Sequence, residues 1–150
     1  MVDQRVAMAS KSAKPAARLQ TISPQFVVPD VIRAAEYYRD VFGFEILGYF
    51  YEPPVYSIVR RDSVEIHLGK ADPNADAAAA PNTPHREDSI DAYVWVDQVD
   101  PLFEELKSRG AKIVEPPTLR AYRCYEMVVE DGFGFRLAFG MDVSGRDKPR

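Results

Sequence analysis

The chain of 150 residues contains an approximate internal repeat. In each half, a short apolar run leads into an acidic residue that precedes a helical stretch, and a glycine ends that stretch. These residues are Asp30 and Gly43 in the first half and Asp97 and Gly110 in the second, so both pairs are 13 positions apart. Each half then finishes on an alternating strand that ends in glycine. The pattern indicates one supersecondary unit used twice, with any ligand site between or inside the two copies.

The composition limits the class of protein and its partners. The length fits one domain with a core large enough to fold without metals or disulfides. Cys124 is the single cysteine, which excludes an intrachain disulfide and fits a reducing compartment. The net charge of −4 argues against a nucleic-acid partner. No apolar run approaches the roughly 18 residues that span a membrane, and no secretory segment is evident, so we expect a cytoplasmic protein without a membrane partner.

Changes in composition along the chain predict one domain built from two modules, with less ordered segments around them. The segment that separates the modules is rich in Ala, Pro, Asn and Asp, as linkers often are. The predicted parts are a flexible N-terminal arm (1–19), one domain (20–141) made of two modules (20–69 and 88–141) and a linker (70–87), and a polar tail (142–150).

The first module reads as strand, helix and three strands. Asp30 is a suitable N-cap, because its carboxylate can accept the unpaired N–H groups of the first turn. Gly43 is suited to the left-handed residue that ends a helix. The apolar face of this helix recurs at helical spacing: Val31, Ala35, Tyr38 and Phe42. Strands are predicted near 20–28, 44–51, 55–61 and 63–69.

The second module repeats this order. Asp100-Pro101 predicts the start of its helix, with Asp100 as the cap and Pro101 at the first helical position. Val99, Leu102, Phe103 and Leu106 form the apolar stripe. Strands are predicted near 89–97, 112–115, 121–130 and 135–140. The fold class is therefore α+β, with two βαβββ modules forming curved mixed sheets around a cavity and helices on the outer face.

Strand alternation divides the side chains between two faces of each sheet. In strand 63–69, the aliphatic side chains share one face and the polar ones the other. Two aromatic side chains alternate with an acid in strand 89–97, which is typical of a pocket wall rather than of a solvated face. The residues predicted to line this inner face and bind a ligand are Glu65, His67, Asp91, Tyr93, Trp95 and Arg136.

These residues also have structural interpretations. His67 fits a hydrogen-bonded cavity histidine, a ligand contact or a metal ligand. Asp91 fits a structural ion pair with Arg136 or with a lysine of the tail. Glu65 fits a charged residue at the rim of the cavity. If Glu65 and Asp91 both face the cavity, they repel each other and favour a cationic guest. The two aromatic residues fit either core packing or a stacking wall for a planar ligand.

The doubled module resembles the vicinal oxygen chelate superfamily of glyoxalases, bleomycin-resistance proteins and dioxygenases, over about residues 20–141. The stretch Tyr122–Glu126 before Asp131 is most similar to the bleomycin-resistance-like branch. The residues that carry the resemblance are Val27-Val28-Pro29-Asp30, Ala35-Glu36-Tyr37-Tyr38, Phe42-Gly43-Phe44, Val96-Asp97 with Val99-Asp100, Gly110-Ala111 and Val129-Glu130-Asp131-Gly132-Phe133-Gly134.

The resemblance implies four positions for metal ligands, and these fall on Ser23, His67, Asp91 and Ala138. The family uses His, Glu or Gln there, since divalent cations need imidazole or carboxylate donors. Ala138 has no donor and Ser23 is a poor one, and two protein ligands rarely hold a catalytic metal. We therefore expect no metal and no other cofactor. The resemblance also implies a homodimer with the ligand in grooves at its interface.

Three classes of function follow. The first is a metal-free binding protein, similar to bleomycin-resistance proteins, that sequesters a planar or cationic small molecule such as an antibiotic. The second is a metal-dependent lyase, isomerase or dioxygenase of the glyoxalase type with a displaced ligand set, formed by Glu65, His67, Asp91 and Glu126. The third is a subunit or regulatory domain without a small ligand.

Overall fold

The computed structural model describes residues 16–75 and 81–145. The predicted arm, linker and tail lie in part outside these residues, so their character stays a prediction. The first module consists of β1 (Gln25–Val28), α1 (Val31–Phe42), β2 (Glu45–Phe50), β3 (Tyr56–Arg61) and β4 (Val64–Lys70). The second consists of β5 (Ala92–Trp95), α2 (Val99–Ser108), β6 (Lys112–Leu119), β7 (Cys124–Glu130) and β8 (Arg136–Asp142).

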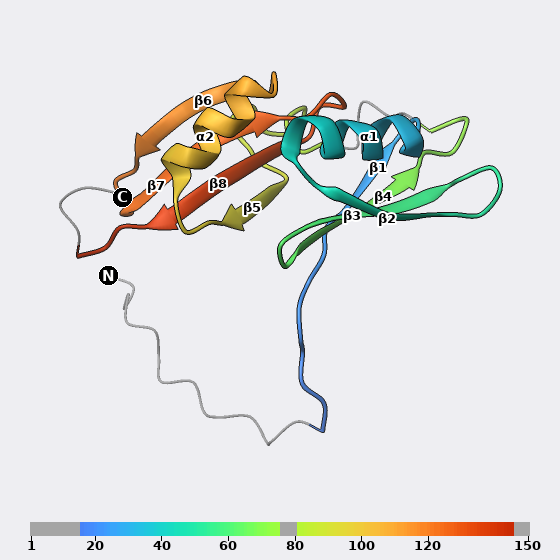
Figure 1. Cartoon of the computed structure of the whole chain (residues 1–150), viewed down its shortest axis with the longest axis horizontal. Helices are drawn as coiled ribbons and strands as arrows, with labels where there is room; N and C mark the ends of the chain where they lie inside the picture. Colours follow the sequence, from blue (N-terminus) through green and yellow to red (C-terminus); the bar gives the residue numbers. More distant parts are fainter. Residues whose placement is uncertain (1–15, 76–80, 146–150) are drawn as a thin grey trace.

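The two modules have the same topology, which confirms the predicted fold class. The sheets have the strand orders β1-β4-β3-β2 and β5-β8-β7-β6. In each sheet, the first and last strands of the module pair in parallel and the remaining pairs are antiparallel. One helix covers one face of each sheet, and the opposite face stays open (Figure 1). Within the described ranges, neither helix has the length and apolar character needed to cross a membrane.

Helix α1 begins and ends where the sequence predicts. The carboxylate of Asp30 accepts hydrogen bonds from the backbone N–H groups of Ile32 at 3.0 Å and Arg33 at 3.2 Å. Gly43 follows the helix with φ of 74°, in the left-handed region that favours glycine. The predicted apolar face is the buried one, and it lies over the first sheet.

The predicted start of helix α2 is wrong. The helix begins at Val99 after Gln98, which makes no side-chain cap, and Asp100 lies inside the first turn. Starting earlier places Val99 in the core with 0% exposure. Pro101 is tolerated there because the first-turn N–H groups have no partner within the helix. Asp100 instead accepts a hydrogen bond from the hydroxyl of Tyr125 at 2.6 Å.

Several predicted strand limits also differ. Strand β1 contains only Gln25–Val28, and residues 16–24 have no regular structure, although the carbonyl oxygen of Pro24 still accepts a hydrogen bond from the N–H of His67 (Figure 1). Strand β5 is shorter than predicted, whereas β6 continues through Pro116-Pro117 to Leu119. A register shift between Glu115 and Thr118 in the pairing with β7 spans these prolines, and β6 is an edge strand, where missing N–H donors are tolerated.

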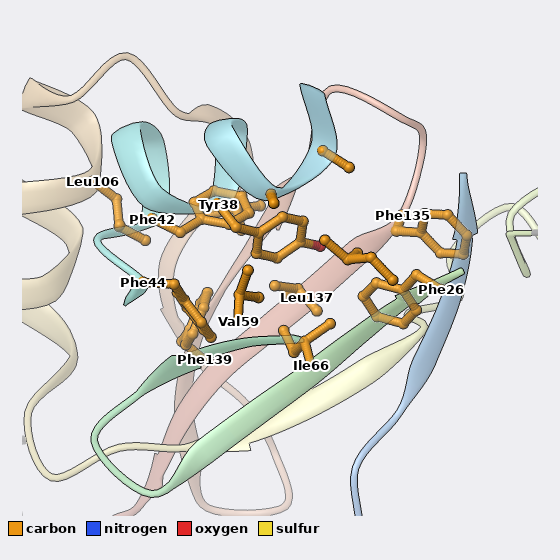
Figure 2. Packing of buried hydrophobic residues seen from close by; sticks show 14 of the residues in the cluster. Phe26, Tyr38, Phe42, Phe44, Val59, Ile66, Leu106, Phe135, Leu137 and Phe139 are labelled. Atoms are coloured by element: carbon orange, nitrogen blue, oxygen red, sulfur yellow. The ribbon is translucent and has the colours of Figure 1, made fainter. Parts of the chain in front are cut away.

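The modules share one hydrophobic core (Figure 2). The rings of Phe26 in the first module and Phe135 in the second stack with centroids 4.4 Å apart. At the other end of the core, the guanidinium of Arg61 donates to both carboxylate oxygens of Glu105 at 2.8 Å. The repeat therefore forms a single packed unit.

Asp131 is a buried carboxylate that joins the modules. It accepts hydrogen bonds from the hydroxyl of Tyr38 at 2.8 Å and from the backbone N–H groups of Phe133 and Phe135 at 2.8 and 2.9 Å. Burial raises the pKa of Asp131 to about 6, although these three donors oppose the rise. The sequence pattern predicts only a turn at this position.

Candidate functional site

The open faces of the two sheets carry most of the predicted binding residues. Glu65 and His67 alternate with Ile66 and Leu68, which are 1% and 0% exposed beneath α1. In the second sheet, Tyr93 pairs with Ala138 and Trp95 with Gly140. These residues alternate with core side chains of β5 and β8. The predicted division of faces is therefore confirmed.

On the open face of the first sheet, His67 has a hydrogen-bond partner at Nδ1 and a carboxylate near Nε2. Its Nδ1 lies 2.8 Å from the hydroxyl oxygen of Tyr56, and its Nε2 lies 3.7 Å from a carboxylate oxygen of Glu65. His67 is therefore a hydrogen-bonded histidine, and it lines neither the inter-module hollow nor the smaller cavity described below. Tyr56 was not among the residues predicted for this face, although the alternation of β3 places it there.

Trp95 and Tyr93 form an aromatic wall on the open face of the second sheet. Their ring centroids lie 4.8 Å apart with the planes tilted by 52°, and Trp95 is 64% exposed. They border a hollow of about 560 Å³ between the modules, which we call the inter-module hollow. Glu65, from the first module, also lines it. The hollow is lined by residues 21–24, 63–66 and 92–95.

A second and smaller cavity, of about 210 Å³, lies on the second sheet, and we call it the Glu126 cavity. Glu126 is only 3% exposed, so strand β7 does turn this side chain inward. Its Oε1 accepts hydrogen bonds from Nε of Arg120 at 3.0 Å and from the hydroxyl of Tyr122. Arg120 also pairs with Glu115. The sequence predicts Glu126 only as a metal ligand and gives no signal for Arg120.

Tyr93 belongs to both the inter-module hollow and the Glu126 cavity. Its hydroxyl passes directly over Gly140, and any side chain at that position would collide with it. Burial raises the pKa of Tyr93, and the carboxylate of Glu126 raises it further, so the phenol keeps its proton at neutral pH.

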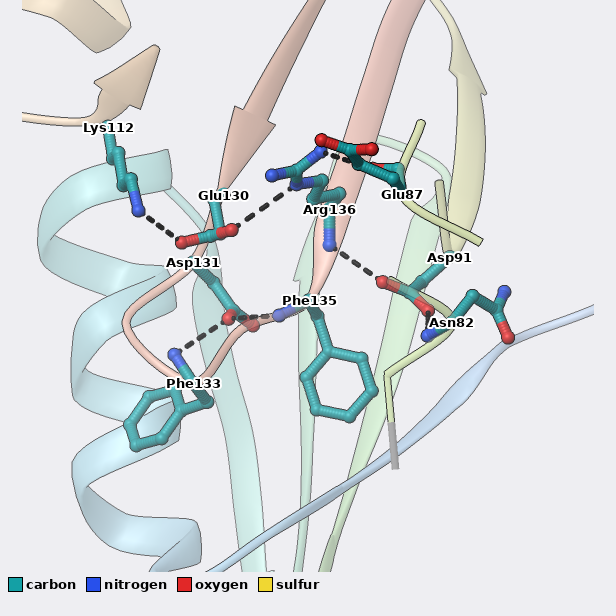
Figure 3. Close-up of polar contacts among 9 residues, drawn as sticks. All are labelled: Asn82, Glu87, Asp91, Lys112, Glu130, Asp131, Phe133, Phe135 and Arg136. Carbon is teal, nitrogen blue, oxygen red and sulfur yellow. Dashed lines mark hydrogen bonds and ion pairs between the residues drawn. The ribbon is translucent and has the colours of Figure 1, made fainter. Parts of the chain in front are cut away.

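The structure gives Asp91 a structural role (Figure 3). Its carboxylate accepts hydrogen bonds from the backbone N–H groups of Asn82 at 2.7 Å and Arg136 at 2.8 Å. The guanidinium of Arg136 instead donates to Glu130 at 3.3 Å and to the carbonyl oxygen of Glu87 at 3.2 Å. Arg136 lines the Glu126 cavity, whereas Asp91 lines neither hollow.

The displaced ligand set proposed for a metal does not assemble within one chain. Glu65 and His67 lie on the first sheet, Asp91 bonds to backbone amides, and Glu126 is paired with Arg120. Across residues 16–75 and 81–145, no group of three or more His, Cys, Asp or Glu side chains lies close enough to hold a metal ion.

The chain thus has a doubled βαβββ fold with open sheet faces and a hollow between its modules. The sequence matches the Glyoxalase/Bleomycin resistance protein/Dioxygenase superfamily over residues 18–139. The chain belongs to this superfamily. No match was found among curated proteins.

Several solved structures share the fold at low sequence identity. TioX from Micromonospora sp. ML1 is 20% identical, with 81% of this chain and 98% of that chain covered and a TM-score of 0.64. The bleomycin resistance determinant encoded on transposon Tn5 is 17% identical, with 83% and 98% covered and a TM-score of 0.65. The bleomycin-binding protein of Streptomyces verticillus, complexed with copper(II)-bleomycin, is 18% identical, with 82% and 96% covered and a TM-score of 0.64.

Proposed function

We propose that this protein binds a planar small molecule with a cationic group and sequesters it without using a metal. The observation that carries the proposal is the position of Trp95, which is 64% exposed on the wall of the inter-module hollow. A large exposed indole is costly to leave in water unless a partner covers it. Glu65 lines the same hollow and supplies a negative charge for a cation.

The structural neighbours support the same class of function. Two of them are described as bleomycin-binding proteins, one complexed with bleomycin and one with copper(II)-bleomycin. Their identity to this chain is only 17% and 18%, so the likeness supports small-molecule binding in general. Antibiotics with planar aromatic groups are the first candidates. A cytoplasmic location, expected from the single cysteine, stays a prediction.

We further propose that the protein acts as a homodimer in which the open faces of two copies meet. Apolar side chains support this, since Leu19 is 100% exposed, Ile22 is 90% exposed and both precede β1 near the open side. A second copy would bury them together with Trp95. Light scattering after size exclusion is expected to give twice the mass of one chain, and a monomer at micromolar concentration would contradict the dimer.

The sequestration proposal is tested through Trp95, because it is the single tryptophan of the chain. Titration with aromatic antibiotics, including bleomycin, is expected to change its fluorescence in a saturable way. Calorimetry of Trp95→Leu should then show affinity reduced by about tenfold or more, since stacking on an aromatic ring is lost. Tyr51→Leu is the control, because Tyr51 is also an exposed aromatic residue, at 80%, and lines neither the inter-module hollow nor the Glu126 cavity. Equal affinity in wild type and Trp95→Leu would refute the role of Trp95.

A further inference from the structure

The shared core is filled at one end and hollow at the other. At the filled end, the rings of Phe26 and Phe135 stack on each other and are only 3% and 4% exposed. Phe44 and Phe139 lie at the opposite end (Figure 2). There they border a hollow of about 340 Å³, which is lined by residues of both modules and which we call the junction cavity.

The internal repeat shows which side chains leave this space. Phe26 lies five residues before the start of α1, and Val94 lies five residues before the start of α2, so the two are equivalent. Phe135 and Val64 are equivalent too, since each lies five residues before the glycine near the end of its alternating strand. Two valines therefore stand at one end of the core where two stacked phenylalanines stand at the other.

A third pair of equivalent residues, in the helices, differs in the same direction. Tyr38 is the eighth residue of α1, and its ring reaches Asp131 through a hydrogen bond of 2.8 Å. Leu106 is the eighth residue of α2 and is the smaller of the two. Leu106 lines the junction cavity together with Val64 and Val94. The cavity thus lies where the second copy of the junction carries smaller side chains than the first.

The walls of the junction cavity are mainly apolar, and solvent reaches part of them. Phe44 and Phe139 are nearly buried, at 4% and 5% exposure. The aliphatic side chains in the wall are only partly buried: Val64, Val94, Val96 and Leu102. Apolar surface that remains in contact with water at a junction of two modules is stabilised when an apolar occupant covers it.

The polar residues of the lining keep their own partners or face water. The guanidinium of Arg61 is bound by Glu105 and by the carbonyl oxygen of Phe42. The other polar residues of the lining are exposed at the rim: Asp62, Ser63 and Asp97. An occupant of the apolar part therefore does not need to displace these interactions, whereas a charge carried into that part would lose its hydration.

An aromatic ring fits this space best. Apolar cavities of about 150 Å³ stay dry and bind benzene, and the junction cavity is larger. Phe44, Phe139 and Trp95 line it and can make edge and stacked contacts with a ring. Aromatic rings also fill the equivalent place at the other end of the core.

We propose that the junction cavity binds an uncharged aromatic ring of a small molecule. The ring takes the place that Phe26 and Phe135 fill at the other end of the core. Trp95 lines both this cavity and the inter-module hollow, so the two sites adjoin. The site goes beyond the proposed function, because it uses neither a cation nor Glu65.

The test titrates the full chain with benzyl alcohol and follows the methyl groups by NMR. Saturable shift changes are expected at Leu102 and Leu106, which line the junction cavity but not the inter-module hollow. Cyclohexylmethanol is the matched probe without an aromatic ring. It is expected to bind at least about threefold more weakly, because the contacts between aromatic rings are lost.

Val94→Phe and Val64→Phe each restore one ring of the filled junction. Each variant is expected to weaken the binding of benzyl alcohol by at least about tenfold and to raise the thermal unfolding temperature, since its side chain occupies the cavity. Val55→Phe is the matched control, because Val55 is 40% exposed and lines neither the junction cavity nor the inter-module hollow. It should bind benzyl alcohol as wild type does, and so should Glu65→Gln.

Three results would overturn the proposal. The first is a titration without saturable shifts at Leu102 and Leu106, which needs no variant. The second is equal affinity for benzyl alcohol and cyclohexylmethanol. The third is wild-type affinity for benzyl alcohol in both Val94→Phe and Val64→Phe. A failure of every aromatic antibiotic to change the fluorescence of Trp95 would instead contradict the proposed function, and benzyl alcohol would still bind in the junction cavity.

Discussion

At the scale of single residues, the carboxylate of Asp131 has two opposite effects on stability. Its hydrogen bonds stabilise the fold, whereas the burial of its charge costs free energy. Three donors from two modules converge on it, so the charge is well hydrogen-bonded although it is buried. Replacement by alanine leaves all three donors unpaired. We expect Asp131→Ala to lower the free energy of unfolding by about 2–4 kcal/mol, measured by urea denaturation, and Asp131→Asn to lose less because its amide oxygen still accepts.

The raised pKa of Asp131 also predicts a pH dependence. The pKa is about 6 in the folded protein and 3.8 ordinarily, so between these values the folded state binds more protons than the unfolded state. The free energy of unfolding of wild type should therefore fall, relative to Asp131→Asn, as the pH rises through this range, by about 3 kcal/mol at most. Above the pKa that Asp131 has in the folded protein, the difference in unfolding free energy between wild type and Asp131→Asn should stay constant. A difference that does not change with pH would contradict burial as the cause.

At the scale of elements, the two helices are equivalent in the repeat but differ in how they begin. Asp30 caps α1 with two hydrogen bonds, whereas Gln98 precedes α2 with a backbone conformation suited to a cap, φ −142° and ψ 119°, but without a side-chain bond. Asp30→Ala should therefore destabilise the protein by about 1 kcal/mol, and Gln98→Ser should stabilise it by about 0.5–1 kcal/mol. Urea midpoints measure both, and a Gln98→Ser variant that is no more stable than wild type would contradict the absence of a cap at Gln98.

Element types and faces could be predicted from the sequence because they depend on local spacing. Alternation was enough to place Glu65, His67, Tyr93 and Trp95 on the open faces. The partners of these residues could not be predicted, because they depend on register and on contacts between distant segments. The bond between His67 and Tyr56 requires the pairing of β3 with β4. The cavity around Glu126 similarly requires the fold of the second module.

At the scale of the whole molecule, the shared core makes the two modules one cooperative unit. A repeat alone allows two units that fold separately, but here the stacked pair Phe26 and Phe135 spans both modules, with exposures of 3% and 4%. The bidentate contact between Arg61 and Glu105 spans them at the other end of the core. Loss of packing at this junction should therefore weaken both modules together.

This cooperativity is tested at the stacked pair. Phe135→Ala and Phe26→Ala should each lower the free energy of unfolding by about 3–5 kcal/mol, and the double variant should lose less than the sum because each change removes the same contact. Unfolding followed by Trp95 fluorescence, which reports on the second module, should coincide with unfolding followed by far-ultraviolet circular dichroism, which reports on both. Two separate unfolding transitions, or losses of unfolding free energy that add in the double variant, would mean that the modules are stabilised independently. The inter-module hollow would then lie between two units that can move apart.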